Sequence, residues 1–137
     1  MIVADTGAVI ALLDADDRHH RELRTLFERD PAAWVLPWAI LAEVDYLAAK
    51  YLGPRAQDAF LADLANDAFR VEWGSDLDLT EAARLHRKHR SMRLGLVDAC
   101  VIAVAERLGA EEIATLDVHH FGAVTIRGDP RLLPRDL

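Results

Sequence analysis

The sequence has little of three features that often decide the class of a protein: cysteine, lysine and long apolar runs. Its single cysteine, Cys100, excludes a disulfide within the chain. The longest apolar run, residues 32–42, contains Pro37 and is well short of the ~20 residues that a membrane-spanning helix needs. The N-terminus has no basic flank and reaches Asp5 before an apolar run can form, so we expect no signal peptide and a cytoplasmic protein.

Of the 16 basic residues, the only lysines are Lys50 and Lys88, and the 23 acidic residues give a net charge of −7. This charge argues against loose binding to nucleic acid through bulk electrostatics. It leaves open a local basic surface, or a metal ion that offsets carboxylates. The length of 137 residues, of which 52% are hydrophobic, fits a single domain over residues 1–137 with one core.

Strand-like and helix-like segments alternate along the chain, with no internal repeat or linker. Short apolar runs predict strands at Ile2–Ala4, Trp34–Leu36, Phe69–Trp73, Ile113–Leu116 and Val124–Ile126. Helices are expected at residues 7–13, 18–29, 37–51, 55–66, 79–90 and 97–108. This alternation predicts an α/β fold with a central parallel sheet and helices on both faces.

Several local features refine these segments. Asp17 is expected to cap the helix at residue 18, and Asp78 and Glu81 have the spacing of a capping box before the helix at residue 79. The three tryptophans lie among sheet residues, so we expect them in the core or an interface rather than stacked on bases: Trp34, Trp38 and Trp73.

Two of the predicted strands run directly into an aspartate, in "MIVADTG" and in "EIATLD". Because ligands of parallel sheets bind beyond the carboxyl ends of the strands, we expect Asp5 and Asp117 to lie near one another. Each residue also has a purely structural interpretation. Asp5 could cap the helix that begins at Gly7, and Asp117 could be a turn residue.

Two further acids lie in otherwise apolar helices. Glu43 is on the shoulder of an apolar helical stripe beside Leu47, where it could instead be a rim residue paired with Lys50. Asp98 is in the first turn of an apolar helix, a position that the helix dipole favours for any acid.

Four carboxylates at one sheet edge would repel each other, and some would take up protons unless a cation offset them. Oxygen ligands select a hard ion, so we expect Mg²⁺ or Mn²⁺ rather than zinc. No group of cysteine and histidine has the spacing of a zinc site, since the pairs at residues 19–20 and 119–120 are adjacent and Cys100 has no second cysteine. His120 is expected to support the site or the fold rather than to contact substrate.

Four segments in this order resemble the PIN-domain nucleases, in particular the toxins of bacterial VapBC toxin–antitoxin pairs. The segments are "IVADTGAVIALLDADD", "LAEVDYL", "LGLVDACVIAVAERLG" and "IATLDVHHFGAV", and the resemblance covers essentially the whole chain. It implies a three-layer α/β/α sandwich around a parallel sheet. It places the catalytic, metal-binding acids of the family on the residues reached above, with two supporting threonines: Asp5, Glu43, Asp98 and Asp117, with Thr6 and Thr115.

The resemblance implies a metal-dependent endoribonuclease that hydrolyses RNA with a metal-activated water. It also implies a cognate antitoxin as the main protein partner, and a homodimer. An alternative is a PIN-like domain that processes RNA, or that binds RNA or protein without cleavage. A haloacid-dehalogenase-type phosphatase is disfavoured, because Gly7 stands where that reaction needs a second aspartate.

A basic stretch precedes Asp98, since residues 82–97 contain no acid. Such residues position RNA through its phosphates without reading its sequence. The structural alternative is that cations near the end of a helix are stabilised by its dipole. Because the stretch adjoins the proposed site, we expect RNA contacts from its five cations: Arg84, Arg87, Lys88, Arg90 and Arg93.

Overall fold

The apolar run at the N-terminus forms the central strand of a five-stranded parallel sheet. In the computed structural model, which describes residues 1–137, β1 (Ile2–Ala4) lies in the middle of the strand order β3-β2-β1-β4-β5. Val3 pairs with Val35 on one side and with Ile113 on the other, and all three are fully buried. A strand buried on both faces is apolar throughout, which explains this run. The other strands are β2 (Trp34–Pro37), β3 (Arg70–Glu72), β4 (Glu112–Ala114) and β5 (Arg131–Leu133).

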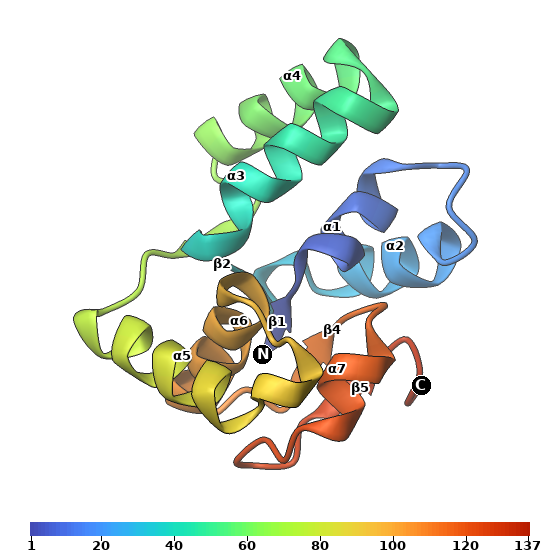
Figure 1. The fold of residues 1–137 in the computed structure, drawn as a ribbon. Coiled ribbons are helices and arrows are strands. Elements are labelled where there is room, and N and C mark those ends of the chain that lie inside the picture. Colours follow the sequence, from blue (N-terminus) through green and yellow to red (C-terminus); the bar gives the residue numbers. More distant parts are fainter.

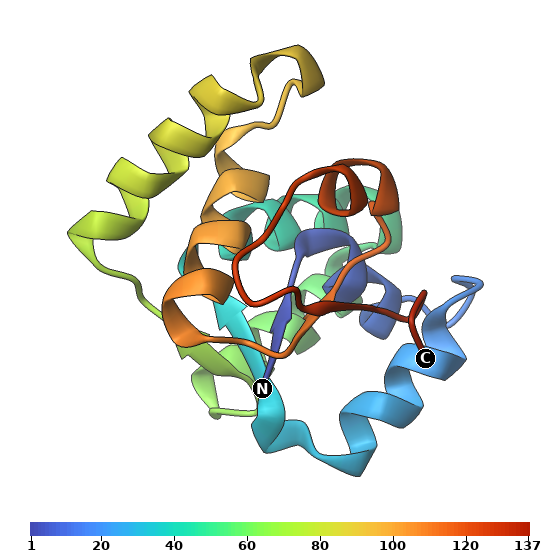
Figure 2. The same ribbon diagram turned by 90° about the horizontal axis from the view of Figure 1, so that it is seen from below.

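The helices form a layer on each side of the sheet, as expected for a three-layer α/β/α fold (Figure 1). One layer contains α1 (Thr6–Leu13) and α2 (His20–Arg29), with α3 (Trp38–Leu47) and α4 (Pro54–Ala65) projecting beside α1. The other contains α5 (Asp76–Lys88), α6 (Leu96–Leu108) and α7 (Val118–Ala123). In both views α5 lies alongside α6 (Figure 2). None of these helices is long and apolar enough to cross a membrane.

The order of the strands creates a switch point between β1 and β4. The chain adds β2 and β3 on one side of β1 and then returns to add β4 and β5 on the other. The segments that follow β1 and β4 therefore lead to opposite helical layers and leave a crevice between them. Asp5 follows β1 directly, and Thr115 follows β4 directly, so both lie at this crevice.

The core lies between the sheet and both helical layers. Its largest fully buried side chains include Trp34, Phe60 and Ile102. The seven consecutive residues 99–105 of α6 are buried, so this helix is apolar on almost every side. Cys100 is one of them, as a small interior residue.

The last predicted strand, Val124–Ile126, is wrong. These residues connect α7 to a turn, and the edge strand β5 comes later, at Arg131–Leu133. Val124 and Ile126 are both buried, so their apolar alternation reflects a connecting segment that packs on the core. The short helix α7 between β4 and this segment was not expected.

The helix expected over residues 37–51 is divided in the structure. α3 ends at Leu47, and a π-helical turn, η2 (Ala48–Leu52), follows.

Trp73 also departs from expectation, because it is 75% exposed rather than in the core, whereas Trp34 is fully buried.

Two predicted caps are displaced. α2 begins at His20 without a side-chain cap, and Asp17 instead accepts a hydrogen bond from the backbone N–H of His19 at 2.8 Å. The capping box of α5 is formed by Ser75 and Asp78, so that helix begins earlier than predicted. Glu81 takes no part in it.

A buried carboxylate connects α5, α6 and β3. Asp78 is 2% exposed and accepts two hydrogen bonds from Arg107, at 2.7 and 3.0 Å. Arg107 also donates to Glu72 of β3 at 2.8 Å. Burial by itself raises the pKa of Asp78, but the bonds from Arg107 and from the N–H of Ser75 outweigh it and lower the pKa below its ordinary value.

We expect Arg107→Met to destabilise the fold by about 2 kcal/mol, because it leaves a buried carboxylate without its charged donors. The loss should shrink as the pH falls below 3.8, since a lowered carboxyl pKa stabilises the fold only where the group is ionised. Urea unfolding at a series of pH values measures both. The control Arg127→Met removes an exposed arginine 3.8 Å from Glu106 and should cost under about 0.5 kcal/mol. Equal losses in the two variants would contradict the assignment.

Candidate active site

The four acids that the sequence singled out line one pocket of about 550 Å³ at the switch point of the sheet. Asp5 follows β1, Glu43 lies on α3, Asp98 lies in the first turn of α6, and Asp117 begins α7. Four segments far apart in the sequence therefore bring their carboxylates to one place. The remaining lining residues are Thr6, Gly7, Ile10, Leu47 and Leu116.

Asp5 is at the same time a helix cap and part of the pocket wall. Its Oδ1 accepts a hydrogen bond from the N–H of Ala8 at 2.9 Å, which caps α1. Its Oδ2 accepts a hydrogen bond from the hydroxyl of Thr115. Asp5 is only 5% exposed, and burial raises its pKa to about 7 despite these two bonds. The geometry therefore confirms that Asp5 caps α1, and it also leaves the carboxylate in the wall of the pocket.

The two threonines differ in their bonding. Thr115 donates to Asp5 and accepts a hydrogen bond from the N–H of Asp117 at 3.0 Å, so it links the ends of β1 and β4. Thr6 also borders the pocket, but its buried hydroxyl has no hydrogen-bond partner within the protein. A buried hydroxyl without a partner is costly, so its place at the pocket suits a bound water or a ligand oxygen.

A histidine joins the acids. Nδ1 of His120 lies 2.8 Å from Oδ2 of Asp117 and 3.1 Å from Oδ2 of Asp98, and the ligand atoms of these three residues lie within 4.8 Å of one another. Burial by itself lowers the pKa of His120, but Asp117 and Asp98 outweigh it and raise the pKa above its ordinary value. Burial, followed by repulsion from Asp117, raises the pKa of Asp98.

The sequence interpretation gave His120 only a supporting role, and the expected donor set contained oxygen alone. The structure places an imidazole in direct contact with two of the acids. The sequence contains a signal for the contact between His120 and Asp117, because residues three apart in a helix lie on the same face. It was missed because α7, which carries His120 three residues after Asp117, was not predicted.

Glu43 occupies the open rim of the pocket rather than its floor, because its side chain is exposed. The structural alternative, an ion pair with Lys50, is not formed. Nζ of Lys50 instead lies 5.7 Å from the ring centroid of Tyr46 and 5.2 Å from that of Tyr51. Glu43 is close enough to Asp98 to contribute to the raised pKa of that acid.

The basic stretch reaches the site at its end only. The backbone of Met92, in the short 3₁₀ helix η3 (Arg90–Met92), is near enough to His120 to contribute to the raised pKa of its imidazole. Arg90 begins this 3₁₀ helix and Arg93 follows Met92 directly, but neither arginine lines the acidic pocket. Arg84 is held on α5 by Glu81, whose carboxylate lies 2.6 Å from Nη2.

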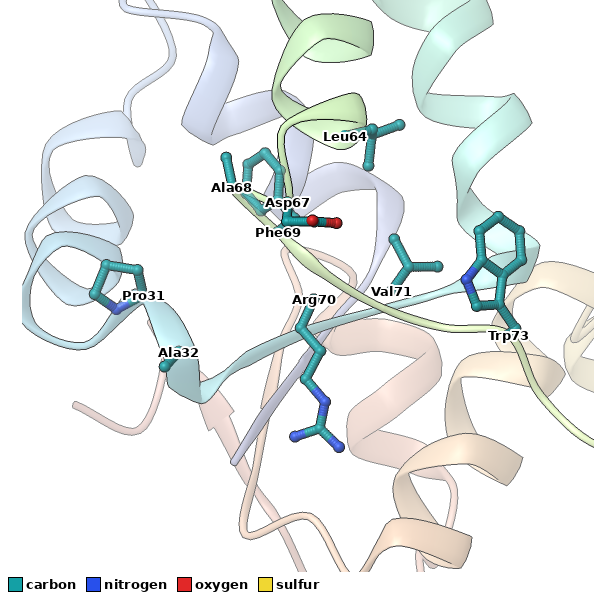
Figure 3. Close-up of a pocket in the computed structure, with 9 residues that line it drawn as sticks. All are labelled: Pro31, Ala32, Leu64, Asp67, Ala68, Phe69, Arg70, Val71 and Trp73. Carbon is teal, nitrogen blue, oxygen red and sulfur yellow. The ribbon is translucent and has the colours of Figure 1, made fainter.

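A larger pocket, of about 670 Å³, lies along the edge strand β3 and is separate from the acids (Figure 3). Val71 of β3 and the flanking residues Phe69 and Trp73 alternate along the chain and line this pocket together with Leu64. Arg70 points away from them. Its only carboxylate is Asp67, so it offers no group of acids. The smaller acidic pocket is therefore the candidate for chemistry.

The residues of the acidic pocket fit a divalent cation. Two of its carboxyl groups, Asp5 and Asp98, have raised pKa values, mainly because burial disfavours their charged forms, and a bound cation would offset that cost. Carboxylates and an unpartnered hydroxyl suit Mg²⁺, and an imidazole beside them also suits Mn²⁺.

The part of the chain that forms the sheet and the acidic pocket matches a known protein family. A family model described as the PIN domain matches residues 2–125, a range that contains all four acids. This chain belongs to the PIN domain family. The assignment agrees with the resemblance found in the sequence segments.

One curated protein and several solved structures are similar to this chain. Ribonuclease VapC26 of Mycobacterium tuberculosis is 32% identical over 130 residues, 95% of this chain and 96% of that protein. The crystal structure of VapC20 from the same species, a toxin that cleaves the sarcin–ricin loop, has a TM-score of 0.80 at 24% identity and covers 92% of this PIN domain and 97% of that chain. The DNA-bound VapBC structure from Salmonella typhimurium has a TM-score of 0.71 at 20% identity, over 96% and 95% of the two chains. At these identities the two structures support the fold.

The raised pKa of Asp5 gives a test by pH. A carboxyl group whose pKa is higher in the folded state stabilises the fold when protonated, and this contribution is lost as the pH rises from 3.8 through about 7. In chelator, Asp5→Asn should therefore raise the melting temperature relative to the parent above about pH 7, and the gain should shrink toward about pH 4.

Melting curves without metal, and then with Mg²⁺ or Mn²⁺, measure this effect. Added metal should stabilise the parent above about pH 7 and have little effect on Asp5→Asn. The exposed control Asp58→Asn should behave as the parent does. A gain in Asp5→Asn that did not depend on pH would show that burial of the charge is not its cause.

Proposed function

We propose that this PIN domain is a metal-dependent endoribonuclease, and the toxin of a type II toxin–antitoxin pair. The observation that carries the proposal is the convergence of four carboxylates, from four separate segments, on one pocket at the switch point. The 32% identity to a protein named as a ribonuclease supports RNA as the substrate. No observation favours the alternative of a non-catalytic binding domain, because all four acids are present and face one another.

We assign the binding of Mg²⁺ or Mn²⁺ to Asp5, Glu43, Asp98 and Asp117. When bound, such an ion lowers the pKa of a water molecule, which then attacks the phosphate, and it offsets charge on the phosphate and on the leaving oxygen. No side chain has to act as the nucleophile.

The chain contributes a fixed geometry to this chemistry. The N–H of Ala8 and the hydroxyl of Thr115 hold the two oxygens of Asp5, so its carboxylate cannot rotate freely. The N–H of His120 donates to Oδ1 of Asp117 at 3.0 Å, and the imidazole contacts Oδ2. The hydroxyl of Thr6 remains free to bond to water or to a phosphate oxygen. Orientation of this kind reduces the entropy lost when the reacting groups come together.

We further propose a cognate antitoxin as the main protein partner, and a homodimer as the state of the toxin. Two of the solved structures with this fold are a toxin–antitoxin complex from Klebsiella pneumoniae and the VapBC complex from Salmonella typhimurium. An acidic pocket of this kind is complementary to an arginine, so an antitoxin that brought one to the carboxylates would block the site.

Amide variants test the catalytic assignment. Asp5→Asn and Asp98→Asn keep the size of each side chain but remove its charge, so cleavage of an RNA panel in Mg²⁺ or Mn²⁺ should fall by at least about 100-fold. The exposed acid Asp58 serves as the control, and Asp58→Asn should cleave as the parent does. If the two site variants fold and cleave at the parental rate, the nuclease assignment is wrong.

Charge reversal tests the RNA contacts of the basic stretch. Arg87→Glu and Arg90→Glu should weaken RNA binding and make its affinity less dependent on salt, because each removes one phosphate contact. Filter binding over a salt series measures both quantities. Arg55→Glu, at the start of α4, makes the same charge change elsewhere. An equal loss in all three variants would assign the effect to net charge alone.

A further inference from the structure

Two tyrosines and a lysine form an exposed group on the arm made by α3 and η2. Tyr46 is 60% exposed and Tyr51 is 68% exposed, although large aromatic side chains are usually covered. Nζ of Lys50 lies over both rings, at the distances of cation–π contacts. We call these three residues the tyrosine–lysine cluster.

Two of the three residues, Lys50 and Tyr51, lie in the π-helical turn that follows α3. In a regular α-helix, residues five apart point in different directions, so Tyr46 and Tyr51 would not share a face. The turn at Ala48–Leu52 closes with a hydrogen bond from the N–H of Gly53 to the carbonyl of Ala48, which is an i→i+5 bond. Lys50 follows Tyr46 by four residues, the spacing of neighbours on a helix, and is next to Tyr51 in the turn, so its Nζ reaches both rings. Such turns often occur at functional sites.

The cluster continues from the acidic pocket along one side of the arm. Glu43 and Leu47 line the pocket, and Tyr46 follows Glu43 by three residues and Lys50 by seven, the spacing of neighbours along a helical stripe. At 1.5 Å per residue, Lys50 lies about 10 Å beyond Glu43 along the axis. A few nucleotides of a single strand span this distance.

The chemistry of the cluster matches a nucleic acid strand. Exposed rings stack on bases of any sequence, and a cation beside them neutralises a phosphate. The protein carries a net charge of −7, and Lys50, one of its 16 basic residues, lies on the same helical stripe as Glu43 of the pocket where a phosphate would react. A cation between the two rings also supplies the positive charge that a phosphate needs and that an apolar protein segment does not require.

We propose that the tyrosine–lysine cluster binds the single-stranded part of the RNA substrate, with bases stacked on Tyr46 and Tyr51 and a phosphate held by Lys50. The proposal rests on the ribonuclease function proposed above, and adds the three residues that hold the strand beyond the acidic pocket. Bases in a duplex are already stacked on one another and cannot use these rings.

Binding of a labelled oligoadenylate to the Asp5→Asn protein, which holds RNA without cleaving it, tests the proposal by fluorescence anisotropy. Adding Tyr46→Ala or Tyr51→Ala should weaken binding roughly tenfold each. Phe at the same positions keeps the ring and should retain the parental affinity. Trp73→Ala removes an equally exposed ring far from the acids and should have no effect. A labelled RNA duplex should bind weakly, and the alanine variants should not change its affinity.

Three results would overturn the proposal: unchanged affinity in both alanine variants, equal losses in the alanine and phenylalanine variants, or a change in oligomeric state without a change in RNA affinity. The last result would assign the cluster to a protein interface. The test of the cluster can be separated from the test of the nuclease function. Cleavage by a parent whose tyrosines do not affect binding rejects the cluster alone, and tyrosine-dependent binding by a parent that cleaves no RNA rejects the nuclease alone.

Discussion

The structure depends on a carboxylate that is buried at the end of its central strand. Asp5 must accept the N–H of Ala8 for α1 to begin where it does, and its bond from Thr115 joins the two strands on either side of the switch point. These bonds do not offset the cost of burial, because the pKa of Asp5 is still raised to about 7. A cation bound beside Asp5 would offset this cost and favour the ionised carboxylate.

The other acids extend this constraint. Asp98 and Asp117 come from different helices but contact the same imidazole, and Glu43 adds a carboxylate from the rim. Such a site has a closed side, fixed by hydrogen bonds, and an open side, bounded by α3 and by the segment near Met92. The closed side suits a fixed cation. The open side carries both groups proposed to hold RNA, the basic stretch and the tyrosine–lysine cluster.

Much of the fold and the convergence of the acids could be predicted from the sequence. The buried strands β1, β2 and β4 are short apolar runs, and the rule for ligand sites in parallel sheets correctly brought Asp5 and Asp117 together. The errors lie where tertiary packing overrides a local pattern. Val124 and Ile126 alternate like a strand because both face the core, and α7 is too short to show a helical period. Without α7, the contacts of His120 could not be predicted, and the π-helical turn that exposes Tyr51 leaves no signal in the pattern.

The most direct test of the account is the titration of the Asp5 carboxyl group, followed by NMR of the side-chain carboxyl carbon with and without Mg²⁺. In the metal-free protein, the group should titrate with a pKa of about 7, because burial disfavours its charged form. With saturating Mg²⁺ the pKa should fall well below that value, since a bound cation stabilises the carboxylate. A pKa near 3.8 without metal, or one that Mg²⁺ did not change, would contradict the claim that this carboxylate is held for a cation.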